Sequence, residues 1–409
     1  MQWPQAPLGE YCEIVSGSTP RTGVKEYWDG DIYWVTPKDL SELNSAYIET
    51  TARKITRAGL DSCSANILPA GSILFSSRAP IGLVAINAVP MCTNQGFKSL
   101  VPDTSKVHNK YLYHWLKINK KRLEDLGNGA TFKEVSKSVV ARVEIPLPSL
   151  PEQRRIAAIL DKADSLREKR RQAIAKLDAL LKSVFIEMFG DPIKNPRAWP
   201  KASLHDVSSK ITDGEHLNPE FVSEGVPMIM AGNVLSTGVS FDDIKFIKPQ
   251  DHEKFHRKCN PQRRDILFVS RGATIGRCTI VDTDRNFSLM GSVILVKPKR
   301  DKVIPEYLST LLAHPAYQQK LYKTSSASAQ QAIYISHVKN LEVLVPPLDL
   351  QIKFTSFYEK QVSLKQPLLK SIQRMELLFQ SLQQRAFSGE LLSEKTLVTT
   401  SSIAVVQHV

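Results

Sequence analysis

Two histidines and a glutamate in the second half of the chain have the spacing of a zinc-protease motif. His252, Glu253 and His256 fit the pattern HExxH, which on a helix places two zinc ligands on one face beside a catalytic glutamate. Because Pro261 follows closely, such a helix must be short, and no third ligand stands at an obvious spacing. We therefore favour a short surface helix and keep a zinc peptidase as the alternative enzyme.

Other catalytic patterns are missing from the chain. There is no GxxxxGK[ST] loop of a motor ATPase. There is no Asp/Asn-Pro-Pro-Phe/Tyr motif of an amino-methyltransferase, since the segment 218–221 has Glu220 at its third position. Asp243-Ile244-Lys245 is only a weak hint of a nuclease site. The sequence therefore predicts a chain without methylation, translocation or cleavage chemistry of its own.

Composition sets wider bounds. With 409 residues, 42% of them hydrophobic, the chain is long enough for at least two packed domains. No apolar run is long enough to span a membrane, and the N-terminus does not resemble a signal peptide, so the expected compartment is the cytoplasm. The odd number of widely spaced cysteines predicts buried free thiols rather than disulfides or a zinc site: Cys12, Cys63, Cys92, Cys259 and Cys278.

The charge favours a polyanionic partner. Lysine and arginine number 54 against 41 acidic residues, a net charge of +13. The surplus is spread along the chain and no basic tail occurs. Any surface that binds nucleic acid must therefore be assembled by folding.

The chain repeats itself at an offset of about 196 residues, from Trp3 to Trp199. Matching segments keep their order, as chance matches would not, and each copy is much longer than a solenoid repeat, so we interpret them as a duplicated domain with its connector. The matched pairs are Trp3-Pro4 with Trp199-Pro200, Ile73–Arg78 with Ile266–Arg271, Tyr111-Leu112 with Tyr307-Leu308, and Pro148 to Gln153 with Pro346 to Gln351.

Each copy reads as an α+β domain rich in loops. Short apolar or alternating runs predict strands, and longer runs predict helices over Tyr111–Leu123 and Pro305–Tyr322. The expected strands are Ile73–Ser76, Val84–Ile86 and Val143–Leu147 in the first copy, and Ile266–Ser270, Thr279–Val281 and Leu341–Val345 in the second.

Each copy then ends in a long helix. A capping box at Ser149 begins the first, residues 151–188, which would be about 57 Å long (38 residues at 1.5 Å) and stop at Gly190. Its single apolar stripe needs a partner helix, which the second copy supplies from Asp349 to Gly389. Pro367 lies inside that second helix and is expected to kink or split it.

These segments together resemble a known family. The phrase Ile145–Ile156, which reads IPLPSLPEQRRI, and the repeated ILFxSR strand are similar to the DNA specificity subunits of bacterial type I restriction-modification systems. The resemblance covers nearly the whole chain, and the second copy of the phrase, from Val345, is eroded.

The resemblance implies an α+β fold with a pseudo-twofold internal repeat. Two globular target recognition domains would be separated by two long helices that form an antiparallel coiled coil. Its segments would be 1–150 (first recognition domain), 151–190 (first spacer helix), 191–348 (second recognition domain), 349–389 (second spacer helix) and 390–409 (disordered tail).

It also implies partners and a role. The chain would be non-catalytic, bind an asymmetric bipartite site in double-stranded DNA, and direct adenine methylation and restriction in phage defence. Its partners would be two methyltransferase subunits and two motor-nuclease subunits. S-adenosylmethionine, ATP and magnesium would bind those partners and not this chain. The alternatives within DNA binding are a specificity partner of a fused methylase-nuclease and a stand-alone regulator.

Loops that read bases need Arg, Lys, Asn or Gln, and phosphates are held by Arg, Lys, Ser or Thr. Arg78 and Arg271 occupy matching places after the repeated strand, either as DNA contacts or as a structural hydrogen bond common to both copies. The candidates are Arg21, Thr36, Lys38, Arg78, Thr131 and Lys133 in the first copy, and His216, Asn233, Arg271, Gln330, Gln331 and Tyr334 in the second. On the first long helix, the basic run Arg167, Lys169, Arg170 and Arg171 is either a solvated face or a phosphate contact.

Overall fold

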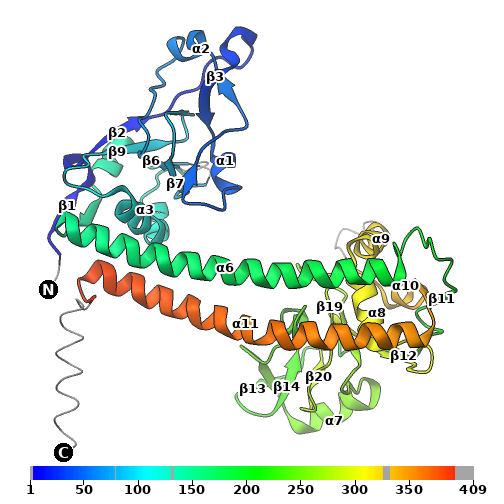
Figure 1. Ribbon diagram of the computed structural model, residues 1–409. Coiled ribbons are helices and arrows are strands. Elements are labelled where there is room, and N and C mark those ends of the chain that lie inside the picture. Colours follow the sequence, from blue (N-terminus) through cyan, green and yellow to red (C-terminus); the bar gives the residue numbers. More distant parts are fainter. Residues whose placement is uncertain (1–2, 79, 130–132, 326–331, 392–409) are drawn as a thin grey trace, which may run out of the picture. The chain divides into compact units, whose positions relative to one another are not determined.

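The computed structural model describes residues 3–78, 80–129, 133–325 and 332–391. The chain divides into a first unit, Met1–Lys169 with Ile372–Val409, and a second unit, Arg170–Ser371. Each unit contains one α+β domain and one half of each of two long helices, α6 (Leu150–Phe189) and α11 (Leu348–Ser388) (Figure 1). Of the expected disordered tail, 390–409, all but the first two residues lie outside the described part of the chain.

The first unit contains a larger sheet with β6 as its central strand and a smaller sheet centred on β3. The five-stranded sheet has the order β2-β9-β6-β7-β4, and a three-stranded sheet has the order β5-β3-β8. Their bounds are β2 Cys12–Ser16, β3 Trp28–Val35, β4 Tyr47–Ile48, β5 Lys54–Ile55, β6 Ile73–Phe75, β7 Val84–Asn87, β8 Cys92–Thr93 and β9 Lys98–Pro102. The first strand of the unit, β1 (Gln5–Pro7), pairs with its last, β10 (Glu144–Pro146), and closes the domain.

The second unit repeats this plan. The order β12-β21-β18-β19 corresponds to β2-β9-β6-β7, and β17-β14-β20 corresponds to β5-β3-β8, with β13 added at an edge. The strands are β11 Lys201–Ser203, β12 Ser208–Asp213, β13 Phe221–Val222, β14 Val226–Ile229, β15 Val234–Leu235, β16 Gly238–Val239, β17 Lys245–Ile247, β18 Ile266–Val269, β19 Cys278–Ile280, β20 Ser288–Leu289, β21 Val293–Pro298 and β22 Glu342–Leu344. The predicted internal repeat is confirmed, because these strands have the same order in both units.

The repeated central strands are apolar on both faces because both faces are buried. Alternate side chains of a strand point to opposite sides. Ile73 and Phe75 of β6 pack into one hydrophobic cluster and Leu74 into another. In β18, Phe268 and Leu267 divide in the same way. This double burial is why an uninterrupted apolar run predicted these strands, and β6 and β18 pair antiparallel with β7 and β19.

The helices of the domains are shorter than predicted. The segments 111–123 and 305–322 were each expected to form one helix, but each is broken into two, at Asn119 and after Leu312. The helices are α1 Pro37–Ser41, α2 Arg57–Asp61, α3 Asn109–Ile118, α4 Lys120–Asp125, α5 Lys137–Ala141, α7 Pro249–Lys258, α8 Pro305–Leu312, α9 Pro315–Ser325 and α10 Ile335–Lys339, with short 3-10 turns at Leu8–Glu10, Lys25–Tyr27 and Ala231–Asn233.

A buried glutamine ties each domain to a long helix. Gln153 Oε1 accepts from His108 N (2.9 Å), and Gln153 Nε2 donates to Lys106 O and Pro148 O (both 2.9 Å). Gln351 makes the equivalent bonds in the second unit, to Ile304 N (2.8 Å), Lys302 O (3.3 Å) and Pro346 O (2.7 Å). Both side chains are fully buried. The glutamine of the repeated motif at the start of each long helix thus joins that helix to its domain.

Within each unit, α6 and α11 pair antiparallel. In the first unit, Arg155 reaches Leu391 O (3.4 Å), and Arg167, farther along α6, pairs with Glu376, which lies earlier in α11. In the second unit, Asp178 pairs with Lys365 (2.5 Å). The ring of Phe185 lies 5.6 Å from that of Phe354. The antiparallel coiled coil is therefore confirmed within each half.

The ends of the long helices follow the predicted glycines, but two details differ. Gly190 and Gly389 have φ values of +80° and +83°, the left-handed conformation that ends a helix. Asp349 does not cap α11, because the helix begins one residue earlier, at Leu348. Pro367 does not split α11, which is one helix from Leu348 to Ser388. Proline removes a single backbone donor, and two residues before it Lys365 pairs with Asp178 of α6 and so ties this part of α11 to its neighbour.

Candidate nucleic-acid interface

The loops beside the repeated strands have the same backbone hydrogen bonds in both units. Because the bonds recur one for one, each loop residue of the first unit has a counterpart in the second. The matching pairs are Ser77 N to Gly96 O (2.7 Å) with Ser270 N to Ser292 O (2.8 Å), Ser18 N to Thr93 O (2.9 Å) with Glu215 N to Leu289 O (2.8 Å), Asn94 N to Val35 O (2.9 Å) with Met290 N to Ile229 O (2.9 Å), and Val135 N to Ser77 O (2.9 Å) with Ile333 N to Ser270 O (2.9 Å).

We call these corresponding positions the loop face of each unit. Their backbones match, and most of their side chains differ. The pairs, first unit then second, are Thr19 and His216, Thr36 and Met230, Lys38 and Gly232, Arg78 and Arg271, Asn94 and Met290, Gln95 and Gly291, and Glu134 and Ala332.

A glycine begins each loop face because two backbones approach closely there. A Cβ atom on Gly17 would lie 1.9 Å from Asn94 O, and one on Gly214 would lie 2.2 Å from Leu289 O. Neither distance is possible for a real side chain. The residues that follow these glycines, Ser18 and Glu215, make the matching backbone bonds of the two loop faces.

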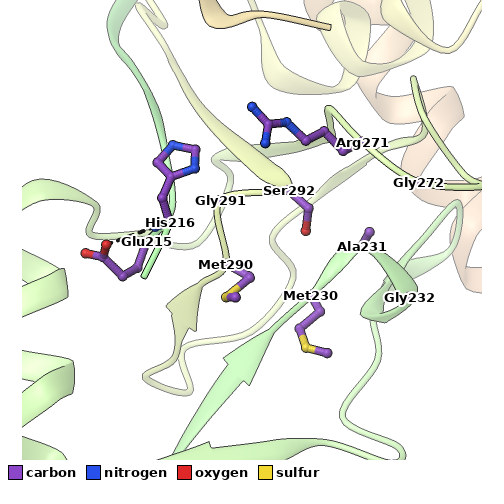
Figure 2. Close-up of a pocket in the computed structure, with 10 residues that line it drawn as sticks. All are labelled: Glu215, His216, Met230, Ala231, Gly232, Arg271, Gly272, Met290, Gly291 and Ser292. Carbon is purple, nitrogen blue, oxygen red and sulfur yellow. Dashed lines mark hydrogen bonds between the residues drawn. The ribbon is translucent and has the colours of Figure 1, made fainter. Parts of the chain in front are cut away.

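The loop face of the second unit contains a pocket of about 500 Å³. Figure 2 shows the Arg271 and His216 side chains on one side of it and the Met230 and Met290 side chains on the other. Arg271 is exposed, and within the described part of the chain it has no ion-pair partner. Its guanidinium is therefore available to an anion.

His216 is held in place by an acidic partner. His216 Nε2 lies 2.5 Å from Asp213 Oδ2, and Lys258 Nζ lies 3.0 Å from the other oxygen of that carboxylate. Burial alone would raise the pKa of Asp213, but hydrogen bonds from Lys258 and His216 outweigh it and lower the pKa below its usual value. The neighbouring Glu215 accepts from the backbone N–H groups of His216 (2.9 Å) and Leu217 (3.0 Å), which fixes this loop.

The loop face of the first unit is polar. Thr19 Oγ1 donates to Gln95 Oε1, and Asn94 Oδ1 accepts from Gly96 N (3.0 Å). Glu134 lies between two cations, with its oxygens 3.0 Å from Lys98 Nζ and 3.9 Å from Arg78 Nη1. Arg78 is therefore oriented by a carboxylate that its counterpart Arg271 lacks, since the matching residue there is Ala332.

The predicted site residues fall into four groups. Arg78, His216 and Arg271 lie together with their neighbours on the loop faces, and Lys38 is exposed there beside Glu42 (3.8 Å). Thr36 and Asn233 serve local structure: Thr36 Oγ1 donates to Asp39 Oδ2 (2.5 Å), and Asn233 Oδ1 accepts from Met230 N (3.1 Å). Arg21, Lys133 and Tyr334 are exposed, and among the described residues no side-chain hydrogen bond or ion pair joins them to the other candidates. Thr131, Gln330 and Gln331 lie outside the described residues.

Several residues on the loop faces were missed from the sequence. Gln95, Asn94 and Glu134 in the first unit and Met230 and Met290 in the second are brought there by strand pairing. An alignment of the two copies could have found them. Positions that differ between two copies of one scaffold mark the surfaces at which the copies differ in function.

The HExxH segment forms the ten-residue helix α7, Pro249–Lys258. The rings of His252 and His256 are 5.1 Å apart, and His252 Nδ1 is 2.9 Å from Ser288 Oγ. Within the described residues, no cluster of three or more His, Cys, Asp or Glu side chains is placed to hold a metal. The short helix favoured from the sequence is confirmed, and it packs its buried Phe255 against Met228 and Ile247.

The basic run on α6 is not a uniform solvated face. The Arg167 side chain is only 12% exposed; it pairs with Asp164 (2.7 Å) and Glu376 and lies over the ring of Phe379, 4.0 Å from its centre. Arg167 is therefore part of the helix pairing, whereas Lys169 is exposed.

The cysteines are free thiols, four of them buried, as predicted, while Cys63 is half-buried. Burial raises the pKa of Cys12, Cys92, Cys259 and Cys278 to about 12, so these four thiols are unreactive at neutral pH. Among the described helices, none has a stretch apolar enough to cross a lipid bilayer.

Comparison with known proteins gives a consistent result. Residues 2–176 and 196–374 each match a family model described as the type I restriction modification DNA specificity domain. The chain is 29% identical over 390 residues to the type I restriction enzyme MjaIX specificity subunit of Methanocaldococcus jannaschii, which covers 90% of this chain and 87% of that one. It is 21% identical to the EcoKI specificity subunit of Escherichia coli K12, with 78% and 73% covered.

A solved structure has the same fold. The S subunit of a type I restriction-modification system from M. genitalium superposes with a TM-score of 0.59 at 17% identity. The superposition covers 95% of this chain and 96% of that one.

Proposed function

The chain belongs to the type I restriction-modification DNA specificity family, and we propose that it is the subunit that reads the DNA target of such a complex. Its two loop faces would each contact one half of a bipartite site in double-stranded DNA. The observation that carries this proposal is the pair of loop faces, in which one backbone scaffold occurs twice with different side chains.

Different side chains on one scaffold favour an asymmetric target. Specificity comes from the groups presented to base edges, while a shared backbone sets how the domain meets the duplex. Asn94 and Gln95 offer amides in the first unit, where the second unit offers Met290 and Gly291. Two identical half-sites would not suit two surfaces with such different hydrogen-bonding capacity.

We further propose that the chemistry resides in partner subunits. The sequence contains no ATP-binding loop of the motor type and no amino-methyltransferase motif. The relatives are named as specificity subunits of type I restriction enzymes, which supports an assembly with other subunits. We infer two methyltransferase subunits and two motor-nuclease subunits, which would bind S-adenosylmethionine, ATP and magnesium, while this chain supplies no catalytic residue.

The test is co-expression with a candidate methyltransferase subunit from the same genome, followed by genome-wide mapping of methylated adenines. We expect one asymmetric bipartite motif with a fixed gap. A stable complex without sequence-specific methylation would contradict the proposal. Failure to form any complex, with DNA binding retained, would favour a stand-alone regulator, and methylation that requires a fused methylase-nuclease would identify that enzyme as the partner.

A further inference from the structure

The pocket on the second loop face has an apolar side that a DNA-binding surface does not need for phosphates. Met230, Ala231 and Met290 line it, together with Gly232, Gly272 and Gly291, which contribute no side chain. Met230 and Met290 are half-buried, so part of each thioether side chain faces the pocket. Met290 also packs against the cluster of Met228, Ile247 and Phe255, which supports it from behind.

Most charged groups in and beside this pocket already have hydrogen-bond or ion-pair partners. Glu215 accepts two backbone N–H groups, and Asp213 beside the pocket is shared by His216 and Lys258. Arg271 differs from these charged groups, because it is exposed and has no ion-pair partner among the described residues. The pocket thus offers one available cation on one side and a methionine surface on the other (Figure 2).

The first unit is polar at the matching positions. At the positions of Met230 and Met290 it has Thr36 and Asn94, and at the position of Gly291 it has Gln95. Apolar side chains recognise the C5-methyl group of thymine in the major groove, whereas Asn and Gln pair with adenine. The two faces therefore differ in the kind of base feature that they can read.

We propose that the pocket lined by Met230 and Met290 binds the C5-methyl group of a pyrimidine in the second half-site. This inference rests on the proposed function, since it names what that loop face reads. Methionine suits the task because its flexible, polarizable side chain fills space around a small apolar group. Arg271 then contacts phosphate or a neighbouring base on the opposite side of the pocket. A C5-methyl group occurs on thymine and on 5-methylcytosine.

The experiment uses the full chain assembled with its methyltransferase subunits and a duplex carrying the mapped target. The second half-site is the one altered in the motif of an Arg271→Ala variant. Each thymine of that half-site is replaced singly by deoxyuridine, and affinities are compared by competition at one salt concentration. At each C·G pair, cytosine is likewise compared with 5-methylcytosine.

We expect one deoxyuridine to weaken binding about three- to fourfold, the effect of one buried methyl group. Met230→Ala and Met230→Gln should each reduce that ratio to about one, and Asn94→Ala in the first unit should leave it unchanged. If the preference appears instead between cytosine and 5-methylcytosine, the methyl group is confirmed and its source is the modified base. Unchanged binding to a scrambled duplex shows that the variants are folded.

The proposal is overturned if neither comparison gives a preference, or if the preference persists in both Met230 variants. If the wild-type complex does not prefer the target over the scrambled duplex, the proposed function fails and this inference fails with it. If the wild-type complex prefers its target but shows no methyl preference at any position, only the methyl pocket is refuted.

Discussion

One side chain, Gln153, makes a fully buried join between the first domain and its long helix. Its fully buried amide makes three hydrogen bonds to backbone groups, so Gln153→Ala leaves two carbonyls and one N–H without partners. The bond to Pro148 O is fully buried, while water can reach the partners at His108 and Lys106. With about 2 kcal/mol for the buried group and about 0.5–1 kcal/mol for each of the others, the loss should be roughly 3 kcal/mol.

Chemical denaturation of the full chain measures this loss. The matched control is Gln380→Ala, an exposed glutamine on α11 in the same unit, which should change stability by less than about 0.5 kcal/mol. Hydrogen exchange adds a local readout, because the His108 amide loses its acceptor and should exchange faster. Gln351→Ala should produce the same defect in the second unit.

The reasoning is refuted if Gln153→Ala is no less stable than Gln380→Ala, or if the His108 amide keeps its protection. The two units need not unfold in one step. The loss of stability in each variant is therefore measured on the unfolding transition that the variant shifts.

Three further outcomes are expected. Glu134→Gln removes a negative charge beside Arg78 and frees that cation for a phosphate. In DNA titrations the plot of log affinity against log salt concentration should steepen by about 0.9 for one added phosphate contact. An unchanged slope would argue against DNA contact at Arg78. Burial would raise the pKa of Asp161, but hydrogen bonds from His114 and Lys110 outweigh it and lower the pKa. The ionised carboxylate therefore stabilises the fold at neutral pH, and this stability should disappear as the pH falls below about 4. Acid denaturation curves of wild type and Asp161→Asn should converge there, and curves that stay parallel would contradict the argument. Gly214→Ala forces a Cβ within 2.2 Å of Leu289 O and should cost about 2 kcal/mol or more by thermal denaturation, whereas an unaffected melting temperature would mean that the loop has room.

Much of the fold follows from periodicity and repetition. The long helices were predictable because a 3.6-residue apolar pattern runs through them and a glycine follows each. The central strands β6 and β18 were predictable because burial on both faces leaves only apolar residues there. The repeat then gave two domains without any knowledge of their topology.

Predictions from local sequence failed where contacts between distant segments determine the structure. Pro367 is a strong helix breaker, yet pairing with the neighbouring helix keeps α11 continuous. Arg167 belongs to a basic run in sequence, but in the structure it pairs with Glu376, more than 200 residues away, and lies over the ring of Phe379.

The site was predictable only in part. Arg78 and Arg271 were found because they follow the repeated strand. Glu134, Gln95 and Met290 were not, because sheet pairing brings them to the loop faces from distant segments. Thr36 has the right chemistry for a DNA contact, but its hydroxyl is engaged by Asp39 at the start of α1.

The central claim is that each unit reads one half of the target. It is tested most directly by mapping methylated adenines in cells that express Gln95→Ala or Arg271→Ala chains with the methyltransferase. We predict that each variant alters or relaxes only one half of the bipartite motif, and that the two variants affect opposite halves. Changes in both halves from a single variant, or in the same half from both, would contradict the account.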